Sequence, residues 1–231
     1  MAIKDNLRET LEEIESARKH SLTGEEVKLI AVSKTHSPEE IKEAIECGIT
    51  DIGENKVQEL QGKMEILQDS VKYHMIGNLQ SNKVKYIYDK VELIHSLDRK
   101  SLLKEINKRA KNDDIIVNCL LEINIAKEES KGGMHYNEVE KFIETCLNYD
   151  NVKINGLMTV APNTEDEAFL RECFRKMFKL KEVINNKNYD KNKIEMKYLS
   201  MGMSQDFKIA IEEGSNMVRV GTKIFGKRDY K

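Results

Sequence analysis

Short apolar runs, each bounded by polar residues or glycine, recur along this chain of 231 residues. The first run, Leu29 to Val32, is apolar throughout, which is typical of a strand buried on both faces, and Lys34 follows it. The pattern predicts eight strands, at KLIAVSK (28–34), TDIGEN (50–55), YHMIGNLQ (73–80), VELIHSL (91–97), IIVNCLLEINI (115–125), VKINGLMTV (152–160), EMKYLSMGM (195–203) and NMVRVG (216–221).

Between most of these runs, apolar residues recur at the spacing of an α-helix. The first helix is predicted near the start of the chain, from Ile3, Leu7, Leu11, Ile14 and Ala17. Further helical patterns are SPEEIKEAIECG (37–48), SNKVKYIYDK (81–90), RKSLLKEINKRAK (99–111), YNEVEKFIETCLNY (136–149), EDEAFLRECFRKMFKLKEVIN (165–185) and QDFKIAIEEG (205–214). In the first of these, Pro38 suits a first turn and Gly48 a C-cap.

Strands that alternate with helices predict parallel pairing. Eight such units, with only 2 prolines and no break in composition, predict a single α/β domain over 1–231, a (β/α)₈ TIM barrel. Residues 1–27 form an N-terminal helix and the lead-in to the barrel. A doubly wound open sheet is the alternative.

Composition and charge narrow the class of function. The chain is 39% hydrophobic and 34% charged with a net charge of −2, so nothing indicates a nucleic-acid partner. We expect a cytoplasmic protein, because the sequence has neither a signal peptide nor a membrane-spanning run. The cysteines, with no C-x-x-C pair, predict ordinary thiols rather than disulfides or a metal site: Cys47, Cys119, Cys146 and Cys173.

The strand ends carry the candidate chemistry, because active sites of this fold lie at the carboxyl ends of the strands. Lys34 at the end of an apolar strand would lose protonation through desolvation and could form a Schiff base with a carbonyl. A lysine that reaches from the strand end into solvent is the simpler interpretation.

The last two strands end in small residues that suit a phosphate. Ser200 and Ser204 follow one strand, and Gly221 and Thr222 follow the next. Small residues let a backbone approach a ligand, and free N–H groups at a helix start bind phosphate. The alternative is that Ser204 only caps a helix and Gly221 only makes a turn.

Arg219 lies on the apolar last strand, where a charged side chain needs a partner. A structural carboxylate inside the barrel would satisfy it, and the sequence leaves that alternative open.

Seven blocks together resemble the pyridoxal phosphate homeostasis protein family, single-domain proteins of fold-type III that bind pyridoxal phosphate (PLP). The blocks cover most of the chain: IAVSKT, GENKVQE, HMIGNLQSNK, LEINIAKEESKGG, GLMTVAP, LSMGMSQDFKIAI and VRVGTKIFG. Two small departures are His36, where a lysine is common, and the loop NIAKEESKGG. Neither touches the residues that the resemblance implies for the cofactor.

The resemblance implies that Lys34 holds PLP as a covalent aldimine. It further implies that Ser204, Gly221 and Thr222 hold the phosphate with Ser200 close by, and that Arg219 faces the pyridine nitrogen. Asn55 and His74 match family positions near the cofactor.

The implied function is to carry or buffer PLP, with effects on amino-acid and keto-acid pools, rather than to catalyse a reaction. The expected partners are PLP and PLP-requiring apoenzymes, and the expected state is a monomer or weak dimer. The family is also similar to the barrel domain of alanine racemase, whose chemistry needs a second acid or base from another domain. We expect no such domain after the last strand.

Three alternatives remain at this point. A PLP-dependent racemase or lyase would need a base inside the barrel, such as His74 or Tyr198. An aldolase-like Schiff-base enzyme would use the lysine and the phosphate site without PLP. A regulatory protein would signal bound PLP to a partner.

Overall fold

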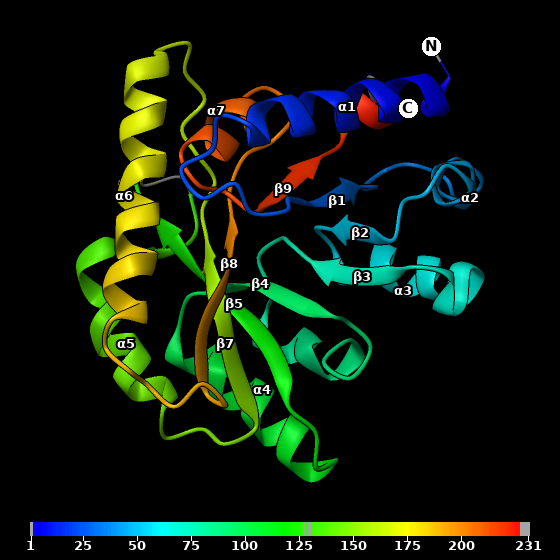
Figure 1. Ribbon diagram of the computed structural model, residues 1–231. Coiled ribbons are helices and arrows are strands. Elements are labelled where there is room, and N and C mark those ends of the chain that lie inside the picture. Colours follow the sequence, from blue (N-terminus) through cyan, green and yellow to red (C-terminus); the bar gives the residue numbers. More distant parts are fainter. Residues whose placement is uncertain (1, 127, 129–130, 227–231) are drawn as a thin grey trace.

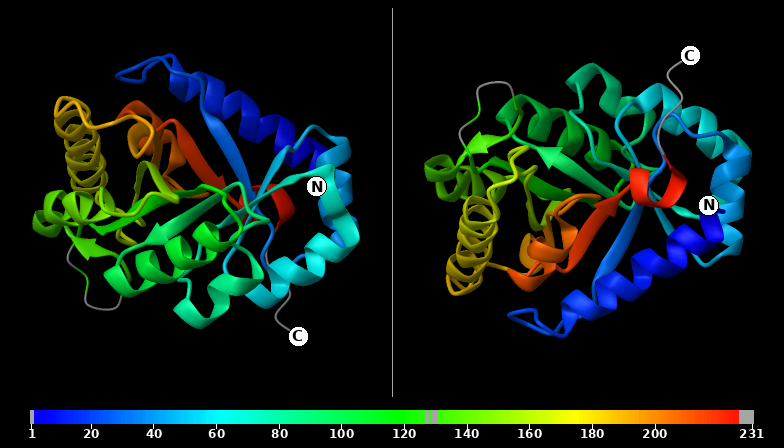
Figure 2. Two further views of the ribbon diagram at one scale, coloured as in Figure 1. Left: turned by 90° about the horizontal axis from the view of Figure 1, so that it is seen from below. Right: turned by 90° about the horizontal axis from the view of Figure 1, so that it is seen from above.

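The computed structural model describes residues 2–126, 128 and 131–226 of the chain. Eight of its strands are parallel and close into a barrel, with helices outside them (Figures 1 and 2). The barrel strands are β1 (Lys28–Val32), β2 (Asp51–Glu54), β3 (Lys72–Met75), β4 (Leu93–Leu97), β5 (Val117–Asn124), β7 (Val152–Met158), β8 (Ile194–Ser200) and β9 (Met217–Val220).

The ring closes because β9 pairs with β1 and β4 pairs with β5. A two-residue strand, β6 (Met134–His135), pairs with the end of β5. Closure excludes the doubly wound sheet, which would leave two edge strands. The predicted TIM barrel, with a helix before the first strand, is confirmed.

The helices follow the strands in the expected order. They are α1 (Ile3–Arg18), α2 (Pro38–Glu46), α3 (Val57–Leu67), α4 (Lys100–Asn112), α5 (Val139–Cys146), α6 (Glu167–Asn185), α7 (Phe207–Glu212) and α8 (Thr222–Phe225). Short 3₁₀ helices are η1 (Gln68–Ser70), η2 (Ser81–Tyr86) and η3 (Tyr136–Glu138). Helix α1 packs against α7, α8 and α2. At α2, Ser37 and Glu40 form a capping box before Pro38.

Besides β6 and α8, which are short and were not predicted, two segments differ from the sequence pattern. Helix α3 was not predicted, because a lysine, Lys63, occupies one of its buried positions and interrupts the apolar stripe. The segment after β3, predicted as helical, forms only the 3₁₀ helix η2. Its apolar anchors Val84 and Ile87 are three residues apart, the spacing that a 3₁₀ helix aligns.

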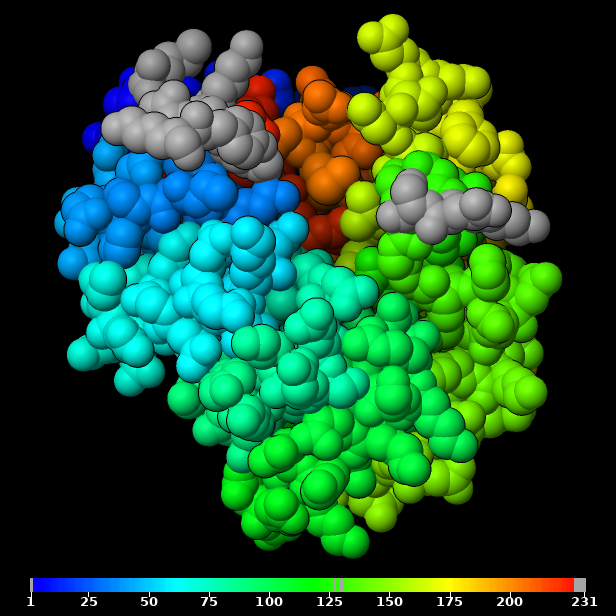
Figure 3. Space-filling model, turned by 180° about the vertical axis from the view of Figure 1, so that it is seen from behind, coloured from blue at the N-terminus to red at the C-terminus, as the bar shows by residue number. Residues whose placement is uncertain are grey.

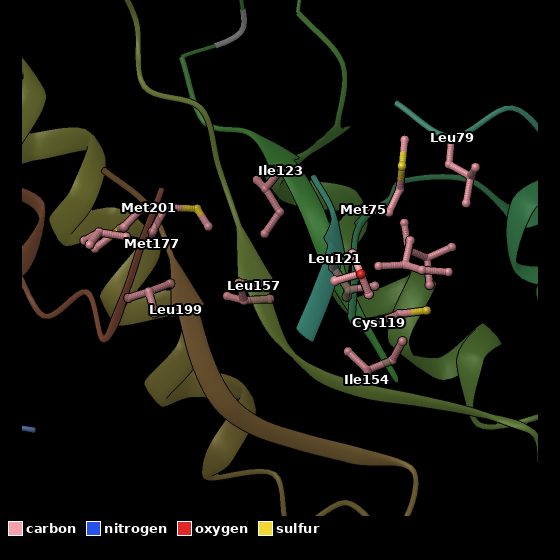
Figure 4. Packing of buried hydrophobic residues seen from close by; sticks show 14 of the residues in the cluster. Met75, Leu79, Cys119, Leu121, Ile123, Ile154, Leu157, Met177, Leu199 and Met201 are labelled. Carbon is pink, nitrogen blue, oxygen red and sulfur yellow. The ribbon is translucent and has the colours of Figure 1, made fainter. Parts of the chain in front are cut away.

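The main apolar core lies between the barrel and the helices (Figure 4). On β5, the residues Cys119, Leu121 and Ile123 belong to this layer, as does Met177 of α6. Cys119, Cys146 and Cys173 are buried free thiols and Cys47 is a half-buried one, which confirms their interpretation as ordinary thiols. No helix in the described ranges is long and apolar enough to cross a membrane.

The inside of the barrel is different. Its apolar content forms a separate, small cluster of Ile30, Leu93, Leu120, Met158 and Met217. The other inward-facing side chains on these strands include buried polar and charged residues: Asp51, His74, His95, Glu122, Ser200 and Arg219. The strands therefore present apolar residues to the outside of the barrel, and both apolar and polar residues to its inside. The polar residues can form hydrogen bonds with one another there.

Candidate functional site

Lys34 lies in the turn that directly follows β1, and it is half-buried. The turn is closed by a hydrogen bond of 3.0 Å from the His36 N–H to the Ser33 carbonyl. Thr35 has a φ of 69°, a left-handed conformation that is uncommon for a residue with a branched side chain. A turn of this kind persists only where its surroundings hold it.

Helix α3 supplies part of that support. The Lys63 ammonium donates to the Ser33 carbonyl at 2.6 Å and pairs with Glu54 Oε1 at 2.5 Å. The Ser33 hydroxyl donates to the same carboxylate oxygen at 2.5 Å, and all three side chains are buried. Desolvation raises the pKa of Glu54, although Lys63 and Ser33 favour its charged form. This buried cluster anchors the residue next to Lys34.

A second contact from α3 holds the other side of the turn. The Thr35 N–H donates to Glu59 Oε2 at 3.1 Å. Beyond it, the His36 ring stacks on Phe225 of α8, with ring centroids 4.7 Å apart. The turn after β1 is therefore tied both to α3 and to the segment that follows β9.

The ends of β1 and β9 approach each other closely at Gly221. A Cβ atom at this position would lie 3.0 Å from the Val32 carbonyl oxygen, so a larger residue would push the two strand ends apart. Thr222 begins α8 immediately afterwards, and the first N–H groups of a helix have no acceptor within it. Lys34, Gly221 and Thr222 thus come from neighbouring strand ends at one end of the barrel.

The loop after β8 meets the loop after β9 through one hydrogen bond. The Gly221 N–H donates to the Ser204 hydroxyl oxygen at 3.2 Å. Helix α7 begins at Phe207, with Asp206 at its N-cap, so Ser204 is not the N-cap that the simpler interpretation assumed. The helix also starts two residues later than the predicted range of 205–214.

This end of the barrel is hollowed. Figure 3 shows it: the dark red segment, the colour of β9, lies recessed between the blue, cyan, green and orange segments. Asn55, directly after β2, contributes to the same end, and its backbone packs against Gly77, where a Cβ would meet the Asn55 carbonyl oxygen at 2.5 Å. We call this end of the barrel the mouth.

Arg219 is buried inside the barrel, with 4% of its surface exposed. Its guanidinium donates to Ser200 Oγ at 2.6 Å and to the Thr159 carbonyl at 2.8 Å. In the part of the chain that the structure describes, no carboxylate lies within ion-pair distance of it. Burial lowers the pKa of Arg219 to about 10, against the opposing charges of Asp206 and Glu122. The direct carboxylate partner left open by the sequence is not found in this part.

His74 lies inside the barrel, on β3. Its ring bonds to Asp51 Oδ1 at 2.8 Å and to His95 Nε2 at 3.0 Å, and it lines a cavity of about 190 Å³ at the amino ends of the strands. Tyr198 lines the same cavity. Ser200 lies between Arg219 and His95. Both residues that the sequence offered as a base inside the barrel thus line this cavity.

Sequence reasoning missed three interior residues: Asp51, His95 and Glu122. Glu122 is buried on β5, and one of its carboxylate oxygens, Oε2, has no hydrogen-bond partner among the described residues. Burial, and then the charge of Asp98, raises the pKa of Glu122 to about 7. The available signal was alternation on β5, where Asn118, Leu120 and Glu122 share the face opposite to the apolar layer.

No group of three His, Cys, Asp or Glu side chains within the described ranges could hold a metal ion. The polar groups that converge on the mouth are instead amine, hydroxyl, amide and guanidinium groups, which suit an anionic organic ligand.

Comparison with known proteins agrees with this arrangement. Residues 5–229 match the family described as alanine racemase, N-terminal domain. A pyridoxal phosphate homeostasis protein of Aquifex aeolicus (strain VF5) is 44% identical over 228 residues, which are 98% of each chain. The chain belongs to the pyridoxal phosphate homeostasis protein family.

Two solved structures resemble the chain over nearly its whole length. A protein from Bifidobacterium adolescentis, described as unknown, is 33% identical with a TM-score of 0.89, and covers 96% of this chain and 94% of its own. PipY of Synechococcus elongatus PCC7942, solved with PLP bound, is 28% identical with a TM-score of 0.83, and covers 97% of this chain and 100% of its own. The barrel is thus the fold of this family.

Proposed function

We propose that the protein binds PLP at the mouth of the barrel and carries or buffers it in PLP homeostasis. The observation that carries the proposal is the convergence of Lys34, Ser204, Gly221 and Thr222 from three strand ends, with Arg219 below them. Family membership and the PLP bound to PipY support it. Effects on amino-acid and keto-acid pools would follow from a change in available PLP.

The residues of the mouth fit a phosphate group. A glycine fits best at position 221, because a Cβ would lie only 3.0 Å from the Val32 carbonyl oxygen. The Ser204 hydroxyl already accepts from the Gly221 N–H, so its own proton is free to point at an anion. Thr222 adds a hydroxyl and a backbone N–H in the first turn of α8. We therefore assign the phosphate to these three residues, with Ser200 nearer the ring.

Lys34 would hold the cofactor covalently. The amine nitrogen would bond to the aldehyde carbon of PLP with loss of water, giving the aldimine. The contacts of Ser33 and Thr35 fix the backbone on both sides of Lys34, which limits the positions that its amine can take. We place Asn55, at the same end of the barrel, near the cofactor, and His74 beyond it.

Arg219 would face the pyridine nitrogen. PLP acts as an electron sink, and it does so best when that nitrogen is protonated. Arginine retains its proton, so it donates a hydrogen bond and leaves the nitrogen unprotonated. The mouth is therefore better suited to holding PLP than to stabilising a carbanion. Because His74 and Tyr198 lie toward the amino ends, a racemase or lyase would lack the base that those residues were to supply.

Reduction with borohydride followed by peptide mass mapping tests the assignment. The protein incubated with PLP is expected to carry a pyridoxyl adduct on Lys34, and the visible absorption band is expected to disappear in Lys34→Ala. Lys56→Ala is the matched control, because Lys56 is exposed and follows β2 at the same end. An adduct elsewhere, with Lys34 unmodified, would refute the proposal.

Delivery is tested separately. In one arm, a dialysis membrane separates the PLP-loaded protein from a PLP-requiring apoenzyme. In the other arm, the two proteins are mixed directly. We expect faster activation than from free PLP at the same free concentration if transfer is direct, and the same rate if the protein only buffers PLP. Sedimentation in both states tests the expected monomer or weak dimer.

A further inference from the structure

A continuous chain of hydrogen bonds crosses the inside of the barrel. Arg219 Nη1 donates to Ser200 Oγ at 2.6 Å, and Ser200 Oγ lies 3.2 Å from His95 Nδ1. His95 Nε2 is 3.0 Å from His74 Nδ1, and His74 Nε2 is 2.8 Å from Asp51 Oδ1. The five side chains come from β9, β8, β4, β3 and β2, and each is buried. We call this set the interior relay.

The direction of every bond in the interior relay follows from its Asp51 end when both imidazoles are neutral. The Asp51 carboxylate can only accept, so His74 carries its proton on Nε2 and donates to it. The unprotonated His74 Nδ1 then accepts from His95 Nε2, and the unprotonated His95 Nδ1 accepts from the Ser200 hydroxyl. Arginine can only donate, so Ser200 Oγ accepts from it, and one tautomer of each ring satisfies all four bonds.

The charges around the interior relay support this assignment. Burial lowers the pKa of His74, although the neighbouring Asp51 carboxylate acts in the opposite direction. Burial lowers the pKa of His95 well below its usual value, and the positive charge of Arg219 lowers it further. Burial would raise the pKa of Asp51, but hydrogen bonds from His74, Thr50 and Lys28 hold it below the usual range. The other charged groups that act on these rings are Lys28 and Glu92, both on His74.

We propose that Asp51 is a positioning residue for Arg219: through His74 and His95 it fixes the orientation of the Ser200 hydroxyl, whose oxygen accepts from the guanidinium. The ligand of Arg219 rests on the proposed function, but the interior relay itself does not. The charge of Asp51 is met by Lys28, and the opposing charges that act on Arg219 are those of Asp206 and Glu122. The interior relay therefore supplies orientation rather than charge, while a second donor of the guanidinium is used on the Thr159 carbonyl.

The far end of the interior relay reaches the opposite face of the protein. Lys28 donates to Asp51 Oδ1 at 3.0 Å, and its side chain is 30% exposed. Lys28 lines the 190 Å³ cavity with His74, and it also lines a larger cavity of about 1050 Å³ at the amino ends of the strands. According to the proposal, Asp51 therefore influences Arg219, the residue assigned to the pyridine nitrogen, from the end of the barrel farthest from the mouth.

The first test uses the protein without PLP. Long-range ¹H–¹⁵N spectra of the histidines are recorded between pH 5 and 8, with assignment by His74→Gln and His95→Gln. We expect two neutral imidazoles with the proton on Nε2 throughout this range. A protonated ring at pH 7, or a proton on Nδ1 of either ring, would overturn the proposal. This result is read from the wild-type protein, so it does not depend on the folding of a variant.

The second test uses Asp51→Asn, with Asp69→Asn as the matched control on the exposed 3₁₀ helix η1. Asp51→Asn should change the ¹⁵N shifts of both His74 and His95, and it should weaken PLP binding about tenfold, the loss of one charged hydrogen bond. Asp69→Asn should change neither. Unchanged His95 shifts in a folded Asp51→Asn would contradict the relay.

The two proposals fail in different ways. If the wild-type protein bound no PLP, the proposed function would be refuted. The spectra of the protein without PLP would still test the hydrogen bonds of the interior relay. If PLP bound normally to Asp51→Asn, the relay would lose its link to Arg219 while the proposed function stood.

Discussion

The outside and the inside of the barrel wall are built from alternate residues of the same strands, yet they do different work. Outside, Cys119, Leu121 and Ile123 of β5 join a continuous apolar layer that packs against the helices. Inside, the same strand presents Leu120 and Glu122 to a small apolar cluster and a set of polar groups. The outer layer supplies most of the stability, and the inner face tolerates buried charge for the sake of the site.

This difference teaches how the site is held. The mouth residues sit on loops, but their supports are the buried polar clusters on either side of the barrel wall: Glu54, Ser33 and Lys63 outside, and the interior relay inside. Substitutions in the apolar layer should therefore affect stability first, whereas substitutions in the polar clusters should affect stability and ligand binding together.

The largest effect is expected from Phe174→Ala on α6. Phe174 is fully buried in the outer layer, so removing its ring leaves a cavity and costs about 3–5 kcal/mol of unfolding free energy. Urea denaturation measures the loss. Phe169→Ala on the same helix is the control, because Phe169 is 39% exposed and should cost far less. Equal losses would mean that the outer layer is not the main source of stability.

Lys63→Met should be nearly as costly. It leaves the Glu54 carboxylate buried without its cation, which costs about 3–5 kcal/mol in comparable cases. PLP binding should weaken as well, because Ser33 next to Lys34 loses a hydrogen bond. The double variant Glu54→Met with Lys63→Met should recover most of the stability but not the binding. A stable Lys63→Met protein with normal PLP binding would show that the cluster of Glu54, Ser33 and Lys63 does not support the binding site.

Glu122→Gln should change how stability depends on pH. Because the pKa of Glu122 is raised from 4.5 to about 7 in the folded protein, its contribution is full below pH 4.5 and is lost as the pH rises through 7. The wild-type protein should therefore lose about 3 kcal/mol relative to Glu122→Gln between these limits. Denaturant unfolding of the apoprotein at pH 5 and pH 8 measures it. The exposed Glu65→Gln should show no such change.

Gly221→Ala should have the smallest effect on stability. Its methyl group would press on the Val32 carbonyl, so we expect a cost of about 1 kcal/mol and a weaker affinity for PLP. Gly62→Ala is the control, since nothing lies within 4 Å of a Cβ there, and alanine in α3 should raise stability by about 0.5–1 kcal/mol. Thermal unfolding and a PLP titration of both variants check the contrast.

Much of the fold could be read from the sequence because the outer apolar layer imposes a periodic pattern. The eight strand runs, such as Leu29 to Val32, appear where they were predicted, and most helices follow. Helix α3 was not predicted because Lys63 interrupts the row of apolar residues on its buried face. The same lysine supports the turn that contains Lys34. A buried charge looks like a surface charge until its partner, here Glu54, is known.

Some residues of the candidate site could likewise be predicted from the sequence, and others could not. Lys34, Arg219, Gly221 and Thr222 stand at the ends of predicted strands, so their meeting follows from the order of strands in a barrel. Asp51 and His95 gave no such signal, because no spacing along the chain connects them to Arg219.

The sequence by itself determined the alternation of strands and helices, the barrel, and the residues at the strand ends, because burial of apolar area acts locally and repeats along the chain. Only the tertiary structure decided which polar residues meet inside the barrel and which groups accept hydrogen bonds from Arg219. Those depend on hydrogen bonds between strands far apart in the sequence, where tenths of an ångström and the direction of one proton determine the outcome.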